Sequence, residues 1–184
     1  MQWEVEQKFH VNDLPAMAAT LAGLGATFEG PVGQIDRYFN HPARDFSQTD
    51  EALRLRQIGD CNFVTYKGPK IDSHTKTRRE LELPLPLGPE ISEQYLQLFQ
   101  ALGFRHSGTV EKTRRPGMLT WQGHEVEIAL DDVKGVGSFL ELEITADDES
   151  LPLAKSVVQA LSERLGLGPS IRRSYLDLLL ESST

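Results

Sequence analysis

Charged side chains at alternating positions mark the stretch EVEQKF, in which Glu4, Glu6 and Lys8 lie two residues apart. Successive side chains of a β-strand point to opposite faces, so these three residues would share one face. Carboxylates are the ligands that hard divalent cations such as Mg²⁺ and Mn²⁺ prefer. Lysine and arginine bind phosphate oxygens. Such a face could therefore hold a metal-bound phosphate compound.

The same alternation of charged and apolar residues recurs along the chain. Its further members are Arg54 and Arg56, Thr65 and Lys67, Arg78 with Glu80 and Glu82, Lys112 and Arg114, Glu125 and Glu127, and Glu141 and Glu143. One such strand is typical of a sheet with one face in water. A solvated face usually mixes Thr, Ser, Gln and Lys, whereas Glu, Arg and Lys dominate here as doublets. The whole set therefore favours a surface that binds a highly charged ligand.

The elements that carry these residues are strands and helices in alternation. Period-two patterns predict about eight strands, in the segments EVEQKF, IDRYF, ALRLR, NFVTYKG, RRELELPL, VEKTRR, HEVEIAL and SFLELEI. Apolar residues at helical spacing predict helices over residues 12–24, 92–102 and 150–165, and a short one over 175–180. The expected N-terminal caps of the three longer helices are Asn12 or Asp13, Ser92 and Ser150.

The order of these elements predicts an α+β fold with an antiparallel sheet, because most strands follow one another as hairpins. The helices need an apolar sheet face to cover, and if they cover it from outside, the charged face points inward. Eight strands closed on themselves leave room for side chains or one small ligand. Buried unpaired ions cost several kcal/mol each, so these charges must pair, stay hydrated or await a ligand. We predict a closed eight-stranded antiparallel β-barrel, a tunnel with a charged interior and helices packed outside.

Length and composition limit the classes of protein. The 184 residues predict a single domain over 1–184. A formal net charge of -8 argues against sequence-independent nucleic-acid binding. The single cysteine, Cys61, permits no internal disulfide and fits a reducing compartment. No apolar run approaches the length of a membrane span, and the N-terminus has no signal-peptide pattern, so we expect a cytoplasmic protein without a membrane partner.

The ordered series of motifs is similar to the CYTH superfamily, the triphosphate tunnel metalloenzymes. Glu4-x-Glu6-x-Lys8 resembles the ExExK signature of that family, and the resemblance continues through QIDRYF, ALRLR, TYKGP, RRELE, VEKTR, ALDDVKGVGSFLELE and RSYLDLL. The family includes class IV adenylyl cyclases, thiamine triphosphatases and inorganic triphosphatases. Its fold is an eight-stranded antiparallel tunnel with helices outside, which agrees with the fold expected from the alternation alone.

The resemblance also implies roles for individual residues. With Mg²⁺ or Mn²⁺ as the cofactor, the implied metal ligands are Glu4, Glu6, Glu141 and Glu143, with Asp131 as a further candidate. The implied triphosphate contacts are Lys8, Arg54, Arg56, Lys67, Lys112 and Arg114, of which Lys8, Arg56 and Lys112 are expected to act in catalysis. Glu80 and Glu82 match the central Glu-x-Glu and are expected near the substrate, orienting cations or its organic part. Glu125 and Glu127 would also face inward, but no role is implied for them.

Three other features receive structural interpretations. The five histidines show no metal-ligand spacing and are expected to be structural or at the surface. His74, between Lys70 and Lys76, could close over a substrate, although a solvated loop is the favoured interpretation. Tyr175 is expected to anchor the last helix to the barrel and to close one mouth of the tunnel.

Two reactions fit a metal-bound triphosphate. In a cyclase, the ribose 3′-hydroxyl of ATP attacks the α-phosphorus and pyrophosphate leaves. In a triphosphatase acting on inorganic, thiamine or nucleoside triphosphates, water attacks the terminal phosphorus and orthophosphate leaves. DDVKGVGSFLELE and RSYLDLL resemble the class IV adenylyl cyclase branch, which favours the cyclase and implies a homodimer. A non-catalytic polyphosphate- or nucleotide-binding module is disfavoured, because anion binding alone needs no metal-holding carboxylates.

Overall fold

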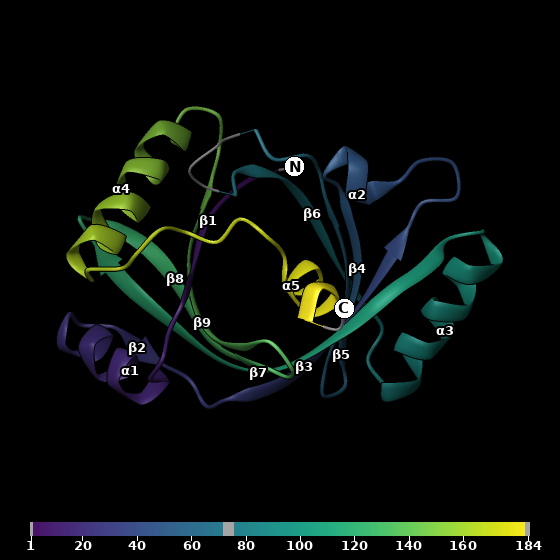
Figure 1. Cartoon of the computed structure of the whole chain (residues 1–184), viewed down its shortest axis with the longest axis horizontal. Coiled ribbons are helices and arrows are strands. Elements are labelled where there is room, and N and C mark those ends of the chain that lie inside the picture. Colours follow the sequence, from purple (N-terminus) through teal and green to yellow (C-terminus); the bar gives the residue numbers. More distant parts are fainter. Residues whose placement is uncertain (1, 72–75, 183–184) are drawn as a thin grey trace.

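An antiparallel sheet closed into a barrel forms the centre of the computed structural model, which describes residues 2–71 and 76–182 (Figure 1). Its strands are β1 (Gln2–His10), β3 (Val32–Asn40), β4 (Ala52–Ile58), β5 (Cys61–Lys67), β6 (Arg78–Leu85), β7 (Arg105–Trp121), β8 (His124–Val133) and β9 (Gly137–Ala146). The order around the barrel is β7-β3-β4-β5-β6-β1-β9-β8, and β8 pairs with β7 to close it. The two-residue strand β2 (Thr27–Phe28) adds to β7. The predicted closed eight-stranded α+β barrel is confirmed.

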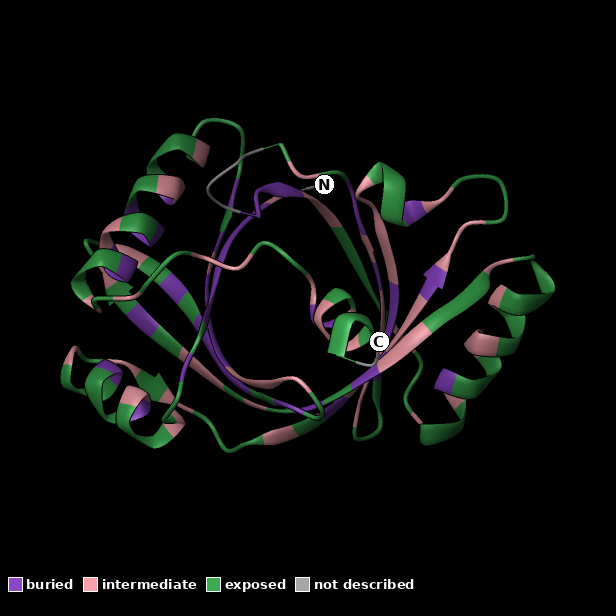
Figure 2. Ribbon diagram, in the orientation of Figure 1, coloured by how far each residue is buried: buried purple, intermediate pink, exposed green. Residues whose placement is uncertain are grey.

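The main hydrophobic core lies between the outer face of the barrel and two helices, α1 (Leu14–Gly23) and α4 (Leu151–Arg164). Leu21 of α1, Leu161 of α4 and Leu142 of β9 are fully buried there. Figure 2 shows the buried residues of both helices on the sides that face the strands. Because the apolar side chains of β1, β8 and β9 point outward into this core, their charged neighbours point into the barrel.

A third helix, α3 (Pro89–Ala101), packs on the outer side of β4, β5 and β7. The predicted start at Ser92 is wrong, since the helix begins directly after Gly88. Gly88 has a φ angle of 128°, which a residue without Cβ adopts at little cost, and the proline that follows suits the first helical position. Ser92 is instead buried in the first turn, where its hydroxyl accepts a hydrogen bond of 2.6 Å from Arg37 Nη1.

The other helix starts follow the sequence more closely. Asp13 caps α1 by accepting a hydrogen bond of 2.8 Å from the Ala16 amide, as predicted. Helix α4 begins after Ser150 as predicted, but the Ser150 hydroxyl bonds to Asp147 rather than to the helix. The four-residue helix α2 (Phe46–Thr49) was not predicted. Within the described ranges, no helix has the length and apolar character that crossing a lipid bilayer requires.

Strand β7 is 17 residues long, whereas the sequence pattern predicted only its segment 110–115. Pro116 and Gly117 lie inside the strand, and they are residues at which a period-two pattern is usually taken to end. Its first half pairs with β3 and its second half with β8, so the strand joins two parts of the barrel wall. This length allows β7 to carry Lys112 and Arg114 at the middle of the wall.

The last helix, α5 (Tyr175–Ser182), is placed differently from the other three long helices. Figure 1 shows it within the opening of the barrel rather than on its outer face. Its first residue packs with Val110, Val133 and Phe139 in a second, smaller core. Gly108 of β7 leaves room for the helix, since a Cβ atom there would lie 2.6 Å from Leu176 Cδ1. The prediction of helices outside the barrel therefore holds for α1, α3 and α4, whereas α5 closes part of one mouth.

Candidate active site

The barrel encloses a cavity of about 510 Å³, a size common among small-molecule sites. All the predicted site residues except Asp131 line it, namely Glu4, Glu6, Lys8, Arg54, Arg56, Lys67, Glu80, Glu82, Lys112, Arg114, Glu141 and Glu143. They come from β1, β4, β5, β6, β7 and β9, and each strand contributes alternate residues because its side chains alternate between wall faces. The structure thus brings the predicted residues together, while their individual roles stay predictions.

Three carboxylates converge on one side of the cavity. Glu6 of β1 is paired with Glu143 of β9, and one oxygen each of Glu4, Glu6 and Glu143 lie within 4.8 Å of one another. Burial and the nearby Glu4 carboxylate raise the pKa of Glu143 well above its ordinary value. In the described part of the chain, the buried Glu4 Oε2 accepts no hydrogen bond. Converging oxygens with spare acceptor capacity fit a hard divalent cation.

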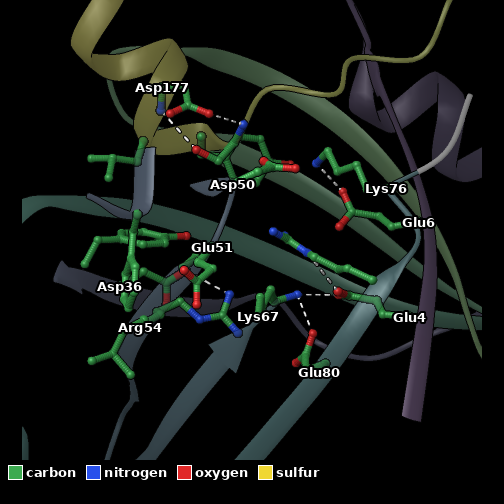
Figure 3. A pocket seen from close by; sticks show the side chains of 18 of the residues that line it. Glu4, Glu6, Asp36, Asp50, Glu51, Arg54, Lys67, Lys76, Glu80 and Asp177 are labelled. Atoms are coloured by element: carbon green, nitrogen blue, oxygen red, sulfur yellow. Dashed lines mark hydrogen bonds and ion pairs between the residues drawn. The ribbon is translucent and has the colours of Figure 1, made fainter. Parts of the chain in front are cut away.

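Basic side chains form ion pairs with two of these carboxylates, Glu4 and Glu6 (Figure 3). Lys67 Nζ forms an ion pair with Glu4 and lies 2.6 Å from Glu80 Oε2. Lys76 Nζ lies 2.5 Å from Glu6 Oε1. The sequence pattern did not assign Lys76, because a polar loop was expected here, although Lys76 lies two residues before Arg78 and so continues the alternation of β6. Its place beside Glu6 makes it part of the site.

Across the cavity, two arginines of β4 surround Asp36 of β3. Arg56 donates two hydrogen bonds of 2.7 Å to the two oxygens of Asp36, and Arg54 Nη1 lies 3.7 Å from Oδ2. Burial alone would raise the pKa of Asp36, but the two guanidinium groups lower it well below its ordinary value. Sequence reasoning missed Asp36, because a single acid in IDRYF looks like an ordinary strand position. It orients both arginines towards the cavity.

Asp131 of β8 is fully buried and contacts Lys112 and Arg114, the two basic residues of β7 that line the cavity. It accepts hydrogen bonds of 2.7 and 2.5 Å from Arg114, one of 3.1 Å from Lys112 and one of 2.9 Å from the Tyr175 hydroxyl. Arg114 also forms an ion pair with Glu141. Among the described residues, neither Asp131 nor Glu141 belongs to the group of three glutamates. Their implied role as metal ligands stays a prediction, and the contacts present show them holding cations of the chain.

Burial lowers the pKa of both lysines next to Tyr175, Lys8 and Lys112. Burial, and to a lesser degree Arg114, lowers the pKa of Lys112 to about 8. Burial and the nearby Lys76 lower the pKa of Lys8 well below its ordinary value. Lys8 Nζ donates a hydrogen bond of 2.5 Å to the Arg173 carbonyl and lies 4.0 Å from the centroid of the Tyr175 ring. Both ammonium groups would gain from an anionic ligand, which would offset the cost of their desolvation.

The remaining candidates divide between the cavity and the surface. Glu82 accepts hydrogen bonds of 3.3 Å from Arg54 and 2.7 Å from Thr65, and its side chain is 40% exposed at the open part of the cavity. Glu125 and Glu127 are both exposed, and of the two Glu127 lines the cavity as expected. His74 lies outside the described residues.

Replacing Tyr175 by phenylalanine is expected to lower the free energy of unfolding by about 1.5–3 kcal/mol, the usual range for a hydrogen bond to a charged group. The reason is that Tyr175 is 5% exposed and its hydroxyl donates to the buried Asp131. The matched control is Tyr95→Phe on α3, which should change stability by less than about 0.5 kcal/mol, as for most partly exposed positions. Urea denaturation followed by circular dichroism measures both. An equal loss of unfolding free energy at the two positions would show that the hydrogen bond from the Tyr175 hydroxyl to Asp131 does not stabilise the fold.

Comparison with known proteins agrees with this geometry. A model of the CYTH domain matches residues 2–175. The chain is 39% identical over 180 residues to "Putative adenylate cyclase MJ0240" of Methanocaldococcus jannaschii, covering 95% of this chain and 97% of that protein. It is 28% identical over 189 residues to "Adenylate cyclase CyaB" of Aeromonas hydrophila, covering 100% of this chain and 92% of that protein. The structure of PH1819 from Pyrococcus horikoshii OT3 is similar with a TM-score of 0.83 and 38% identity, covering 97% of this chain and 98% of that one. The chain therefore belongs to the CYTH domain family, as its motifs predicted.

Proposed function

We propose that the protein is a metal-dependent enzyme that converts ATP to cyclic AMP and pyrophosphate inside the barrel. The balance of charges in the cavity carries this proposal, since twelve carboxylates and nine lysine or arginine side chains of the described residues line it. A site built for a free polyanion would be net positive. A cavity with an excess of carboxylates instead suits a triphosphate that enters together with divalent cations, which the acids hold while the basic groups hold the phosphates.

Each group of residues has a distinct task in this proposal. Glu4, Glu6 and Glu143 would hold the metal ion, which when bound supplies a Lewis acid and orients the phosphate oxygens. Arg54 and Arg56, held by Asp36, offset the negative charge that develops on those oxygens. Lys112 and Arg114, held by Asp131, do the same from the wall formed by β7.

The choice of a nucleotide rests on the apolar part of the cavity lining and on the relatives. Apolar side chains of Phe46, Leu53, Leu176 and Leu180 also line the cavity, and they offer surface to an organic group that inorganic triphosphate lacks. Two relatives that match nearly the whole chain carry names with adenylate cyclase. Both observations support ATP, with the 3′-hydroxyl of its ribose as the nucleophile.

Product analysis tests the proposal. Purified protein is incubated with Mg²⁺ or Mn²⁺ and, separately, with ATP, thiamine triphosphate and tripolyphosphate, and the products are identified by chromatography and phosphorus NMR. Cyclic AMP and pyrophosphate from ATP are expected. Release of orthophosphate would replace cyclisation by terminal hydrolysis, while keeping the metal-bound triphosphate as substrate. Tight nucleotide binding without any product would make the protein a binding module.

Ligand binding should also stabilise the fold. Tripolyphosphate with Mg²⁺ at a hundredfold excess over Kd is expected to add about 2.7 kcal/mol to the free energy of unfolding. Tripolyphosphate with EDTA should add far less, because the carboxylates outnumber the cations in the cavity. Thermal denaturation under the two conditions measures the difference. An equal Tm with metal, with EDTA and without ligand would mean that the interior charges are merely paired and hydrated.

A further inference from the structure

Lys76 lies beside Glu6, one of the three converging glutamates (Figure 3). Its backbone amide donates a hydrogen bond of 2.9 Å to the Glu6 carbonyl, so its main chain is fixed against β1. Its ammonium lies 2.5 Å from Glu6 Oε1, and the two side chains are only 5% and 6% exposed. A buried cation is therefore held on one of the carboxylates that form the candidate metal site.

A divalent cation and this ammonium would compete for the same carboxylate, that of Glu6. Glu6 belongs to the group whose oxygens lie within 4.8 Å of one another, so a metal ion held there needs the Glu6 carboxylate that Lys76 now occupies. Two cations sharing one buried carboxylate repel strongly, because the interior screens charge poorly. The dication has the larger charge and the other two glutamates to bind it, so the ammonium is the group that must leave.

The two lysines paired with these glutamates differ in the ion-pair partners that remain to them once a metal ion binds. Lys67 contacts both Glu4 and Glu80, so it keeps an ion pair if a metal ion takes Glu4. For Lys76, Glu6 is the one ion-pair partner among the described residues. Lys76 lines the cavity together with Lys8, whose ammonium repels it. Glu141 attracts the Lys76 ammonium, but that carboxylate already forms an ion pair with Arg114. A displaced Lys76 would thus have no carboxylate to itself until an anion enters.

We propose that Lys76 is the resident counter-ion of the metal site, that a divalent cation displaces its ammonium from Glu6 into the cavity, and that it then binds a phosphate group of the substrate. The inference rests on the proposed function and adds an order to it. Metal binding creates a phosphate-binding cation that is otherwise occupied, so the triphosphate binds tightly only after the metal has bound. Lys76 is a counter-ion of Glu6 before the metal binds and a binding residue for the phosphate afterwards.

The experiment measures metal and phosphate binding separately, without turnover. Calorimetric titration of Lys76→Met with Mn²⁺ in the absence of phosphate should show affinity about fivefold or more tighter than wild type, because the competing cation is gone. Titration of the Mn²⁺-saturated variant with tripolyphosphate should show affinity about fivefold or more weaker. Lys76→Arg, which keeps the charge, should bind Mn²⁺ no more tightly than wild type. Damage to the fold weakens both affinities and cannot produce opposite changes.

Lys70→Met is the matched control, because Lys70 lies in the same segment and lines the cavity but pairs with Asp50 instead of a glutamate of the group. Its Mn²⁺ affinity should stay within about twofold of wild type. If wild type binds Mn²⁺ and Lys76→Met binds it equally or more weakly, the inference is overturned and the proposed function stands. If wild type binds no Mn²⁺ and converts no triphosphate, the proposed function fails and the inference fails with it.

Discussion

Replacing Glu4 by glutamine is expected to lower kcat/KM with ATP by about tenfold or more. Mutation of residues that only orient metal ligands already lowers metal affinity or activity by about 10–100-fold. Glutamine keeps the shape of the side chain but removes the charge from one of the three converging carboxylates. Mn²⁺ affinity, measured by calorimetry, should fall in parallel. The fold should survive, because Lys67 keeps its ion pair with Glu80 when Glu4 loses its charge. Glu143→Gln should behave in the same way.

The control for Glu4→Gln lies on the outer wall. Glu111 pairs with Lys134 at 2.9 Å, and its side chain is 51% exposed. Glu111→Gln should change kcat/KM by less than about twofold, because exposed ion pairs contribute little. Wild-type rates for both Glu4→Gln and Glu143→Gln at saturating Mg²⁺ or Mn²⁺ would remove the three glutamates from the metal site and leave the charged cavity without its proposed cofactor.

Replacing Arg56 by lysine is expected to lower kcat/KM by the equivalent of roughly 1–3 kcal/mol. Arg56 uses two of its N–H donors in hydrogen bonds to Asp36, and its other N–H groups can donate to a phosphate oxygen. Lysine keeps the charge but loses the planar fork, so it cannot satisfy Asp36 and the substrate in the same geometry. Steady-state kinetics with ATP at saturating metal measures the change.

Arg79 provides the comparison for Arg56 because it lies on the outer face of β6. Its guanidinium is 4.1 Å from the centroid of the Trp3 ring and 2.7 Å from Asp148 Oδ1. Arg79→Lys should therefore alter the rate by less than about twofold. Equal losses at positions 56 and 79 would contradict the inward placement of charge on which the whole site depends.

The sequence predicted the barrel and most of its lining because both follow from one local rule. Alternation places every second side chain of a strand on one face, so Glu4, Arg56 and Lys112 could be placed inside from their own neighbours alone. Asp36 escaped this reasoning, since a single acid among mixed residues looks like an ordinary strand position. The role of Asp36 follows from its contacts with Arg54 and Arg56 on the adjacent strand, and neither segment alone predicts that these two strands pair.

Other features depend on contacts distant in sequence. Lys76 meets Glu6 across 70 positions, and Tyr175 meets Asp131 across 44, so no local pattern could reveal either pair. The predicted start of α3 was wrong because serine is preferred over glycine at the N-terminal cap of a helix. Gly88 takes that position because it fits the backbone angle that the turn requires. The placement of α5 in the barrel opening likewise depends on Gly108, a residue whose importance is only the space it leaves.

The pairing of β1 with β9 has a consequence for synthesis on the ribosome. Phe9 pairs with Leu140, so the first strand waits for the ninth to emerge, on the order of ten seconds at ordinary translation rates. During that wait β1 exposes an unpaired edge, which invites association with other nascent chains. Glu4, Glu6 and Lys8 interrupt its apolar residues with charge and oppose such association. The side chains proposed to hold metal and phosphate in the finished barrel thus also protect the unfinished one.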